Sequence, residues 1–310
     1  MRGFSGSITL EKTKMIKIAL IGGAKHYHAR SWSQMFNGRD KKLVKKHAFP
    51  VYTEDTRAHG AKITHVFDDN RADAELLARV CNIPNIVDRQ EDVIGRVDAI
   101  IIPDDRSMKH QKRAVIFLKE GLPTFVDKTL SPDPCEAESI IALARKHKAP
   151  FMSASALRFS REIEEFNRKD RAAVGEIVTG GAIGPNELVF YGIHPLEALI
   201  TLVGSGVRSV RNGGSINRDL LTIEYKDGRL FTLTSNAAMG YVFQINLYGT
   251  KGWRQVTISD SAYFYMTMLK RFVQMVKTGQ PPFPPEETLE IIRILAAGAK
   301  LRNSTRKIWI

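Results

Sequence analysis

The sequence predicts an α/β protein in which an N-terminal Rossmann domain, with a doubly wound parallel sheet, precedes a C-terminal α+β domain built on a mostly antiparallel open sheet. Three observations support this prediction. Short β-rich runs alternate with helical stretches from residue 15 to about 155, which is the pattern of βαβ units. The run 97–102 is rich in Val and Ile on both faces, as a central parallel strand covered by helices requires. After Ala156, apolar and polar residues alternate in several runs, as in antiparallel strands.

The first domain is expected to contain six strands, at 16–21, 62–67, 85–87, 97–102, 124–126 and 151–154. Helices connect them. Asn70 is suited to cap the helix after the second strand, because its side chain can accept from the first free N–H groups. The last helix of the domain is expected to open at Ser131-Pro132, with Asp133 and Glu136 in its first turn, where carboxylates favour the helix dipole.

The second domain is expected to contain strands at 176–182, 219–225, 229–235 and 242–248, followed by helices at 262–277 and 286–300. Asp227-Gly228 is a strong signal for a β-hairpin. We therefore divide the chain into a flexible extension (1–14), a dinucleotide-binding domain (15–156) and a substrate-binding and oligomerisation domain (157–310). An open antiparallel sheet needs a cover, so a homodimer or homotetramer is expected.

The composition is that of an ordinary globular protein, with 310 residues, 43% of them hydrophobic. The two cysteines, Cys81 and Cys135, lie far apart, which supports neither a disulfide framework nor a thiolate zinc site. Apolar runs are much shorter than the roughly 18 residues of a membrane span. These features indicate a cytoplasmic protein without a membrane partner.

The chain carries a net charge of +13, and its densest basic run lies at 39–47. The run lacks the interleaved aromatic residues of a platform for single-stranded nucleic acid. It is interpreted as a solvated face or as a field that attracts an anionic ligand, with a polyanion contact as the alternative. No nucleic-acid partner is expected, because no binding motif accompanies the charge.

Gly22-Gly23 follows the first strand, where a dinucleotide site needs a sharp turn before a helix N-terminus. The usual glycines two and five residues after Gly22 are replaced by Ala24 and Tyr27, so a simple tight turn is the alternative. Asp68 ends the second strand and is expected to accept hydrogen bonds from the adenosine ribose. The alternative is that this carboxylate only caps a helix.

Polar residues near these strand ends are further candidates. His26 and His28 flank Tyr27, but two histidines without a third ligand make a poor metal site, and no metal is expected. Asp104 and Asp105, which follow the fourth strand, either line the cofactor cleft or cap the next helix. The segment from Asn37 to Lys62 is rich in apolar residues and is expected to form an ordered lobe near the adenosine or the cleft rim.

Several motifs occur in the order and spacing of a known family: Asp98-Ala-Ile-Ile-Ile-Pro103 followed by His110, Asp127-Lys128-Thr129, Arg158-Phe159, Gly175-Glu-Ile177, Gly192-Ile-His194 and the segment 272–282. From Lys17 to Ile310 the chain thus resembles the glucose-fructose oxidoreductase and inositol dehydrogenase family, written Gfo/Idh/MocA. The resemblance implies a nicotinamide cofactor, NAD or else NADP, between the domains, and a carbohydrate-like substrate.

The resemblance also implies roles for individual residues. Lys128 would point at the substrate oxygen beside the carbon that exchanges hydride; a surface lysine at a strand end is the alternative. His194, at a helix N-terminus where the dipole disfavours the imidazolium, would hold the substrate or relay a proton, and a satisfied structural histidine is the alternative. Arg158 and Tyr191 would also contact the substrate. The residues expected to bind the cofactor are Gly22, Gly23, Ala24, His26, Tyr27, Asp68, Pro103, Asp104, Asp105, His110, Asp127 and Lys128.

Two departures from the family pattern affect this assignment. Many relatives carry an aspartate four residues before the histidine, where this chain has Phe190, which cannot transfer a proton. Tyr191 is then a candidate substitute in catalysis. Thr129 replaces a proline, so the turn after Lys128 is expected to be looser.

Three functions remain open at this stage. The first is hydride transfer between NAD(P) and a hydroxyl or carbonyl of a sugar, cyclitol or related metabolite. The second is elimination or hydrolysis of a glycoside through transient oxidation by bound NAD. The third is a catalytically quiet cofactor sensor or scaffold. Asp68 favours NAD over NADP, because a carboxylate repels a 2′-phosphate, whereas Arg71 works against this preference.

Overall fold

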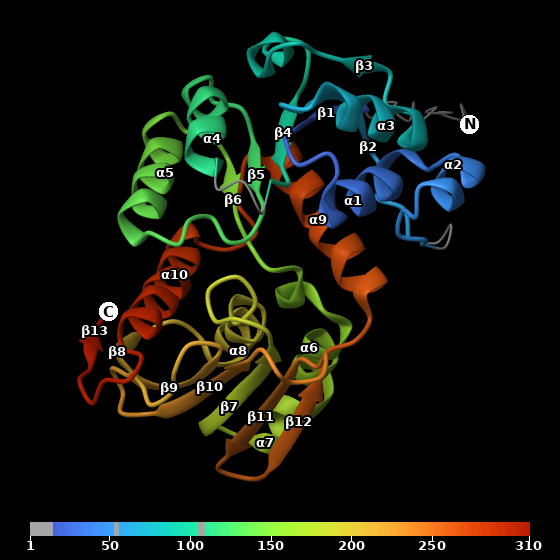
Figure 1. The fold of residues 1–310 in the computed structure, drawn as a ribbon. Helices are drawn as coiled ribbons and strands as arrows, with labels where there is room; N and C mark the ends of the chain where they lie inside the picture. Colours follow the sequence, from blue (N-terminus) through green and yellow to red (C-terminus); the bar gives the residue numbers. More distant parts are fainter. Residues whose placement is uncertain (1–14, 53–55, 105–108) are drawn as a thin grey trace, which may run out of the picture.

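The computed structural model describes residues 15–310 except 53–55 and 105–108. The predicted extension 1–14 and the candidate Asp105 lie outside the described residues. Figure 1 shows two sheets stacked along the long axis of the molecule, each covered by helices. This arrangement confirms the predicted fold class.

The first sheet is parallel throughout and has the order β3-β2-β1-β4-β5-β6. This is the strand order of a dinucleotide-binding fold. Ile100, Ile101 and Ile102 in β4 are fully buried because helices cover both faces. The strands are β1 (Ile16–Ile21), β2 (Ala61–Phe67), β3 (Asn85–Ile86), β4 (Ala99–Ile102), β5 (Thr124–Val126) and β6 (Phe151–Met152).

The connecting helices are α1 (Tyr27–Asn37), α2 (Lys41–Lys46), α3 (Arg71–Cys81), the 3₁₀ helix η1 (Gln90–Val93), α4 (His110–Lys119) and α5 (Pro134–Lys146). The Asn70 side chain caps α3 by accepting from the N–H of Ala72, as predicted. The expected start of α5 at Ser131 is wrong by two residues: Asp133 is the cap and Pro134 is the first helical residue. The Ser131 hydroxyl donates instead to Glu136.

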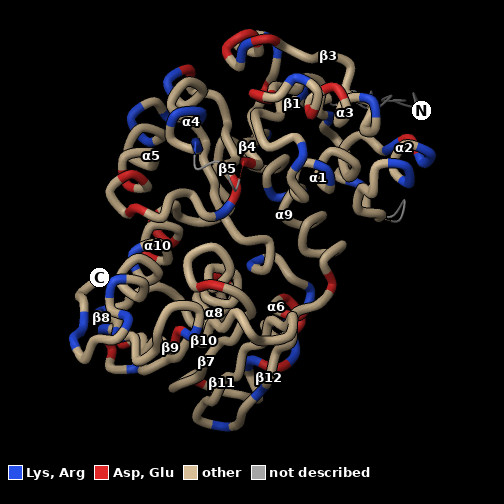
Figure 2. The backbone as a smooth tube through the Cα atoms, in the orientation of Figure 1, with Lys and Arg blue, Asp and Glu red and all other residues tan. Residues whose placement is uncertain are grey.

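The described part of the segment between α1 and β2 packs into the first domain. Val44, Phe49 and Tyr52 are buried in its core, and a place near the adenosine or the cleft rim stays a prediction. The Tyr52 hydroxyl lies 2.7 Å from that of Tyr27, which ties the segment to the start of α1. By contrast, the lysines of α2 are exposed and form a basic group at the end of the domain in Figure 2.

The second sheet has the order β12-β11-β7-β10-β9-β8-β13. Its pairs are antiparallel except β7 with β10. The predicted hairpin at Asp227-Gly228 joins β9 to β10, and Gly228 has a φ of +88°. Strands β8, β12 and β13 were not predicted from the sequence. The strands are β7 (Ile177–Pro185), β8 (Val207–Asn212), β9 (Arg218–Tyr225), β10 (Leu230–Asn236), β11 (Gln244–Gly249), β12 (Trp253–Thr257) and β13 (Ile308–Trp309).

Helices α8 (Ile193–Val203) and α10 (Pro285–Lys300) pack on one face of this sheet. The other face exposes Leu230, Tyr248 and Trp253. Short helical segments connect the two sheets: η2 (Ala156–Phe159), α6 (Arg161–Glu165), the π-helix η3 (Phe166–Asp170) and α7 (Arg171–Val174).

Helix α9 (Ser261–Thr278) follows β12 but returns to the first sheet, where Figure 1 shows it beside α1 and β5. Phe272 of α9 packs against Phe125 of β5 with ring centroids 5.9 Å apart. Tyr265 lies edge-on to Trp32 of α1 at 6.4 Å. The first sheet ends with β6 and the second begins with β7, but α9 carries residues of the second half of the chain into the first core.

No helix among the described residues is long and apolar enough to cross a membrane. The described residues likewise contain no group of three or more His, Cys, Asp or Glu placed to hold a metal ion.

Candidate active site

A cavity of about 620 Å³ lies where the start of α1, the end of β5, the start of α8 and helix α9 meet. It brings together the three predicted catalytic residues Lys128, Tyr191 and His194, and also His26 and Tyr27 of the predicted cofactor site. These residues come from both halves of the chain. The cavity is therefore the candidate active site.

The turn between β1 and α1 is built on two glycines in the left-handed region, Gly22 at φ +76° and Gly23 at φ +66°. A Cβ at Gly23 would lie 2.7 Å from the carbonyl oxygen of Pro103, so the turn packs directly on the end of β4. No side chain caps α1, whose cap residue is His26. The free N–H groups at such a helix start favour an anion.

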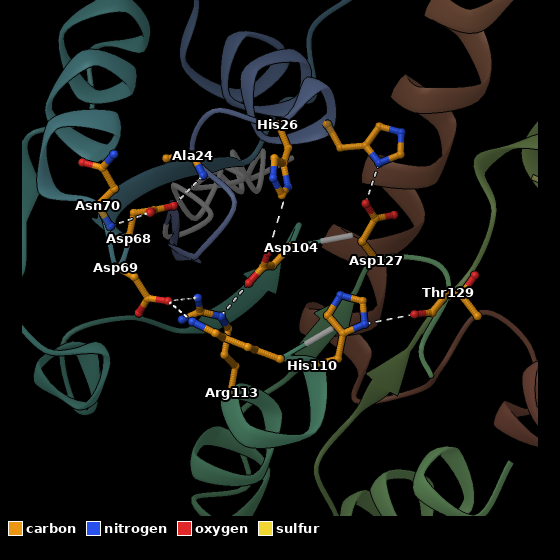
Figure 3. Close-up of polar contacts among 12 residues, drawn as sticks. Ala24, His26, Asp68, Asp69, Asn70, Asp104, His110, Arg113, Asp127 and Thr129 are labelled. Carbon is orange, nitrogen blue, oxygen red and sulfur yellow. Dashed lines mark hydrogen bonds and ion pairs between the residues drawn. The ribbon is translucent and has the colours of Figure 1, made fainter. Parts of the chain in front are cut away.

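Asp68 closes this turn, as Figure 3 shows. Its carboxylate accepts from the backbone N–H of Ala24 at 2.7 Å and from that of Asn70 at 2.8 Å. These bonds place the acid at the edge of the turn, where a ribose contact was predicted. The carboxylate also acts locally, since it fixes the backbone before α3.

Arg113 was missed by the sequence reading. Its buried guanidinium donates to Asp104 at 2.9 Å and to Asp69 at 3.0 Å, and it lies 2.7 Å from where a Cβ of Gly22 would be. The hydrogen bond from Lys109, with the neighbouring Arg113, lowers the pKa of Asp69. The sequence did carry one signal for this contact. Because β4 lies next to β1 in the sheet, a long side chain in the first turn of the helix after β4 can reach the Gly22-Gly23 turn.

The helix N-terminus and the two glycines are features that dinucleotide diphosphate sites use, and the Arg113 guanidinium adds a cation beside Gly22. Asp68 supplies an acceptor for the ribose. The residues of this turn therefore fit NAD.

His110 does not line the cavity. Its Nδ1 atom lies 3.0 Å from each of the carbonyl oxygens of Thr129 and Leu130, so the imidazole holds the turn that follows Lys128. The Thr129 hydroxyl donates to the carbonyl oxygen of Val189 at 3.0 Å. The turn that we expected to be loose is thus held from both sides.

Asp127 is buried and hydrogen-bonds with two groups. It accepts from the backbone N–H of Lys128 at 2.7 Å and lies 2.5 Å from Nδ1 of His28. Nε2 of His28 lies 3.0 Å from the hydroxyl of Tyr265. Burial raises the pKa of Tyr265 well above its usual value, so the phenol keeps its proton. Because a carboxylate accepts, the His28 imidazole donates its Nδ1 proton to Asp127.

From the sequence, His28 was considered only as a metal ligand, and Tyr265 was not predicted to belong to the site. The imidazole also stacks on Trp32, with centroids 4.9 Å apart. His28 and Asp127 are 99 residues apart in the chain, and no local signal links them.

His194 lies in the first turn of α8, as predicted. Its Nδ1 atom is 2.7 Å from the hydroxyl oxygen of Ser155. The ring lies edge-on to Tyr191 and Phe243, at centroid distances of 5.7 and 5.4 Å. These contacts fix the imidazole at the cavity wall.

Arg158 was expected to bind the substrate, but it does not line the cavity. Its buried guanidinium donates to Glu197 at 2.8 Å and to Glu287 at 2.7 Å, and it lies 4.0 Å from the ring centre of Phe283. Burial raises the pKa of Glu197, although Arg158 opposes this shift. The arginine therefore ties η2 to α8 and α10.

Residues 16–155 match a family model described as an oxidoreductase family with an NAD-binding Rossmann fold, GFO_IDH_MocA. The protein is thus an NAD-binding oxidoreductase with a Rossmann fold. The family model that matches residues 16–155 is that of the Gfo/Idh/MocA family, the family that the sequence motifs indicated. The search of curated proteins found no match.

Solved structures extend the likeness in fold to nearly the whole chain. Myo-inositol 2-dehydrogenase from Lactobacillus plantarum is 16% identical, with a TM-score of 0.78 over 96% of this chain and 100% of that one. Scyllo-inositol dehydrogenase from Lactobacillus casei, with bound NAD(H) and scyllo-inositol, is 15% identical, with a TM-score of 0.76 over 96% and 99%. A myo-inositol dehydrogenase from Corynebacterium glutamicum is 15% identical, with the same TM-score and coverage.

Proposed function

We propose that the protein transfers a hydride between NAD(H) and a hydroxyl or carbonyl group of a sugar, cyclitol or related metabolite. The observation that carries this proposal is the presence of Lys128, Tyr191 and His194 in one cavity beside the Gly22-Gly23 turn. The inositol dehydrogenases of similar fold support the substrate class.

The cofactor would be held by groups from three elements. The N–H groups at the start of α1 and the Arg113 guanidinium would bind the diphosphate, and Asp68 would accept from the ribose. Pro103 and Asp104 would line the floor of the turn. When bound, NADH supplies the hydride for the carbonyl carbon of the substrate.

Lys128 would donate the matching proton. As the carbonyl carbon gains a hydride, its oxygen gains the proton of the Lys128 ammonium, and the carbonyl becomes a hydroxyl. In the oxidation direction this proton returns to the lysine amine. His194, whose ring is fixed by Ser155, would hydrogen-bond the substrate. Tyr191, which lies edge-on to this histidine, would also contact the substrate. Phe190 also lines the cavity but contributes no proton.

The test is a panel of keto-sugars and keto-cyclitols added to protein and NADH, with the nicotinamide absorbance followed over time. Loss of absorbance with formation of the alcohol supports the proposal. Products that form without net turnover of the cofactor would instead indicate transient oxidation. Cofactor binding with no chemistry on any compound would contradict the proposal and favour a sensor or scaffold.

The proposed partners are a carbohydrate-like small molecule and further copies of the same chain, in a dimer or tetramer. The exposed face of the second sheet supports self-association, since Leu230, Tyr248 and Trp253 lie in one row across it. A cytoplasmic location and the absence of a nucleic-acid partner stay predictions.

A further inference from the structure

The candidate active site has two aromatic walls. One wall consists of Tyr27 from α1 with Phe264 and Tyr265 from α9, and its neighbouring ring centroids lie 6.2 and 4.7 Å apart. The other consists of Tyr191, Tyr241 and Phe243, of which Tyr241 and Phe243 are 5.2 Å apart. These distances are typical of packed aromatic pairs.

The rim of the cavity exposes two of these rings. Tyr241 is 78% exposed and Tyr27 is 51% exposed. Both residues line the cavity, Tyr27 as part of the first wall and Tyr241 as part of the second. When a flat apolar group covers such an exposed ring, apolar surface of both groups is removed from water, and this favours binding.

The cavity lining contains only a few types of polar side chain among the described residues. Lys128 is the cationic side chain among its lining residues, together with three histidines and several hydroxyl groups. None of the described lining residues is Asp, Glu, Asn, Gln or Arg. Asp127 lies behind the wall and is already bonded to His28 and Lys128.

The hydroxyl, imidazole and ammonium groups of the described lining residues can each pair with a hydroxyl of a polyol ring, but none offers the paired hydrogen-bonding atoms of a carboxylate or carboxamide. Such a ring presents a hydroxyl at almost every carbon, and each buried hydroxyl needs a partner. Carboxylates and carboxamides, which offer two hydrogen-bonding atoms each, do not line this cavity in the part of the chain that the structure describes. By contrast, seven of the described lining residues are Phe or Tyr.

We propose that the substrate is a hydroxyl- or keto-bearing ring that carries an aryl substituent, with its reacting oxygen at Lys128 and its aryl group between the two aromatic walls. The inference rests on the proposed function and narrows its substrate class. The hydride and proton move as described above, and the aryl group takes no part in the chemistry. Tyr241 and Phe243 are then specificity-determining residues.

The experiment compares matched ligands on the NADH-loaded protein. Phenyl and methyl β-glycosides of glucose, galactose and mannose are titrated by calorimetry. For at least one sugar, the phenyl glycoside should bind at least about tenfold more tightly than the methyl glycoside, a difference of about 1.4 kcal/mol in binding free energy. Tyr241→Ala should reduce this ratio of affinities to below about threefold, because the aryl group loses one of the rings that cover it.

Trp309→Ala is the control, since Trp309 is an aromatic residue of similar exposure, at 57%, that does not line the cavity. This variant should keep the full phenyl preference. Equal affinities within every pair, or a preference that survives Tyr241→Ala, would overturn the inference.

Turnover separates the inference from the proposed function. Oxidation of unsubstituted sugars with kcat/KM equal to or above that of the phenyl glycosides would leave the function standing and refute the aryl preference. Tight phenyl glycoside binding that Tyr241→Ala abolishes, with no oxidation of any sugar, would support the inference about the ligand and refute hydride transfer.

Discussion

Lys128 is presented to the cavity by a peptide that is fixed on both sides. Its own N–H is bound by Asp127, which is in turn bound by His28. Thr129 is bound through its carbonyl oxygen by His110 and through its hydroxyl to Val189. Because the backbone on either side cannot shift freely, the ammonium keeps its position relative to the β1–α1 turn. This geometry underlies the predictions for single residues.

Lys128→Met should lower kcat by roughly 10²–10⁴, the range typical of losing a general acid or base, because no other ammonium reaches the substrate oxygen from the described lining residues. NADH affinity should change little. Steady-state kinetics and fluorescence titration measure the two quantities. Tyr191→Phe is the discriminating variant: if it abolishes turnover while Lys128→Met retains most of it, the phenol is the acid.

His28→Ala should lower kcat about tenfold and leave KM nearly unchanged, since the loss would act through the position of Lys128 rather than through substrate binding. His28→Asn should restore much of the rate, because a carboxamide N–H can replace Nδ1–H as the donor to Asp127. The exposed His59 gives the control variant His59→Ala. A rise in KM without a fall in kcat would contradict the positioning role.

Asp68→Ala should weaken the preference for NAD over NADP. In the native protein we expect at least a tenfold preference, about 1.4 kcal/mol, because the carboxylate repels a 2′-phosphate. Arg71 does not offset this, since it is paired with Glu75 and Asp88. Titration of both cofactors against both proteins gives the result. Tighter binding of NADP by the native protein would refute the assignment of Asp68.

At the scale of elements, α9 joins the two halves of the molecule. Its aromatic residues pack on α1 and β5, while its start lies directly after β12. The same helix carries Phe264 and Tyr265 to the cavity wall. Stability of the first core and the geometry of the site therefore depend on the same element.

Phe272→Ala should destabilise the protein by about 3–5 kcal/mol, the cost of removing a fully buried aromatic side chain. Urea unfolding followed by circular dichroism measures this loss. Lys270→Ala, at an exposed position of the same helix, should stay within about 0.5 kcal/mol of the native protein. A loss below about 1 kcal/mol for Phe272→Ala would show that α9 contributes little to the first core.

At the scale of the whole molecule, the two faces of the second sheet differ. One face is covered by α8 and α10, and the other carries a cross-strand row in which Trp253 pairs with Tyr248, Tyr248 with Thr179 and Thr179 with Leu230. An exposed apolar row on a broad sheet favours an isologous contact with a second copy. The lysines of α2 lie at the far end of the molecule and leave this face clear.

The double variant Leu230→Lys with Tyr248→Lys should convert a dimer or tetramer into a smaller species, because like charges would meet across the two-fold axis. Light scattering after size-exclusion chromatography measures the mass. Lys41→Glu on α2 should leave the mass unchanged. A native protein that is monomeric at high concentration would contradict the predicted self-association.

Some residues were assigned correctly from the sequence and others were not. The cap of α3 at Asn70 was predicted correctly because an N-cap depends on a few adjacent residues. The start of α5 was misplaced because Ser131-Pro132 and Asp133-Pro134 are both suitable starts, and Ser131 binds Glu136 instead. Arg158 was assigned to the substrate, whereas its partners Glu197 and Glu287 lie in helices distant in the chain.

By itself the sequence determined the two-sheet fold, the Gly22-Gly23 turn and the placing of Lys128 and His194 at the ends of elements, because periodicity, caps and turns are encoded over short stretches. Only the tertiary structure decided that His28 binds Asp127 and Tyr265, that Arg113 covers Gly22, and that α9 completes the first core. Those contacts join segments far apart in the chain. Their partners are selected when packing removes water and each buried polar group must find a hydrogen bond.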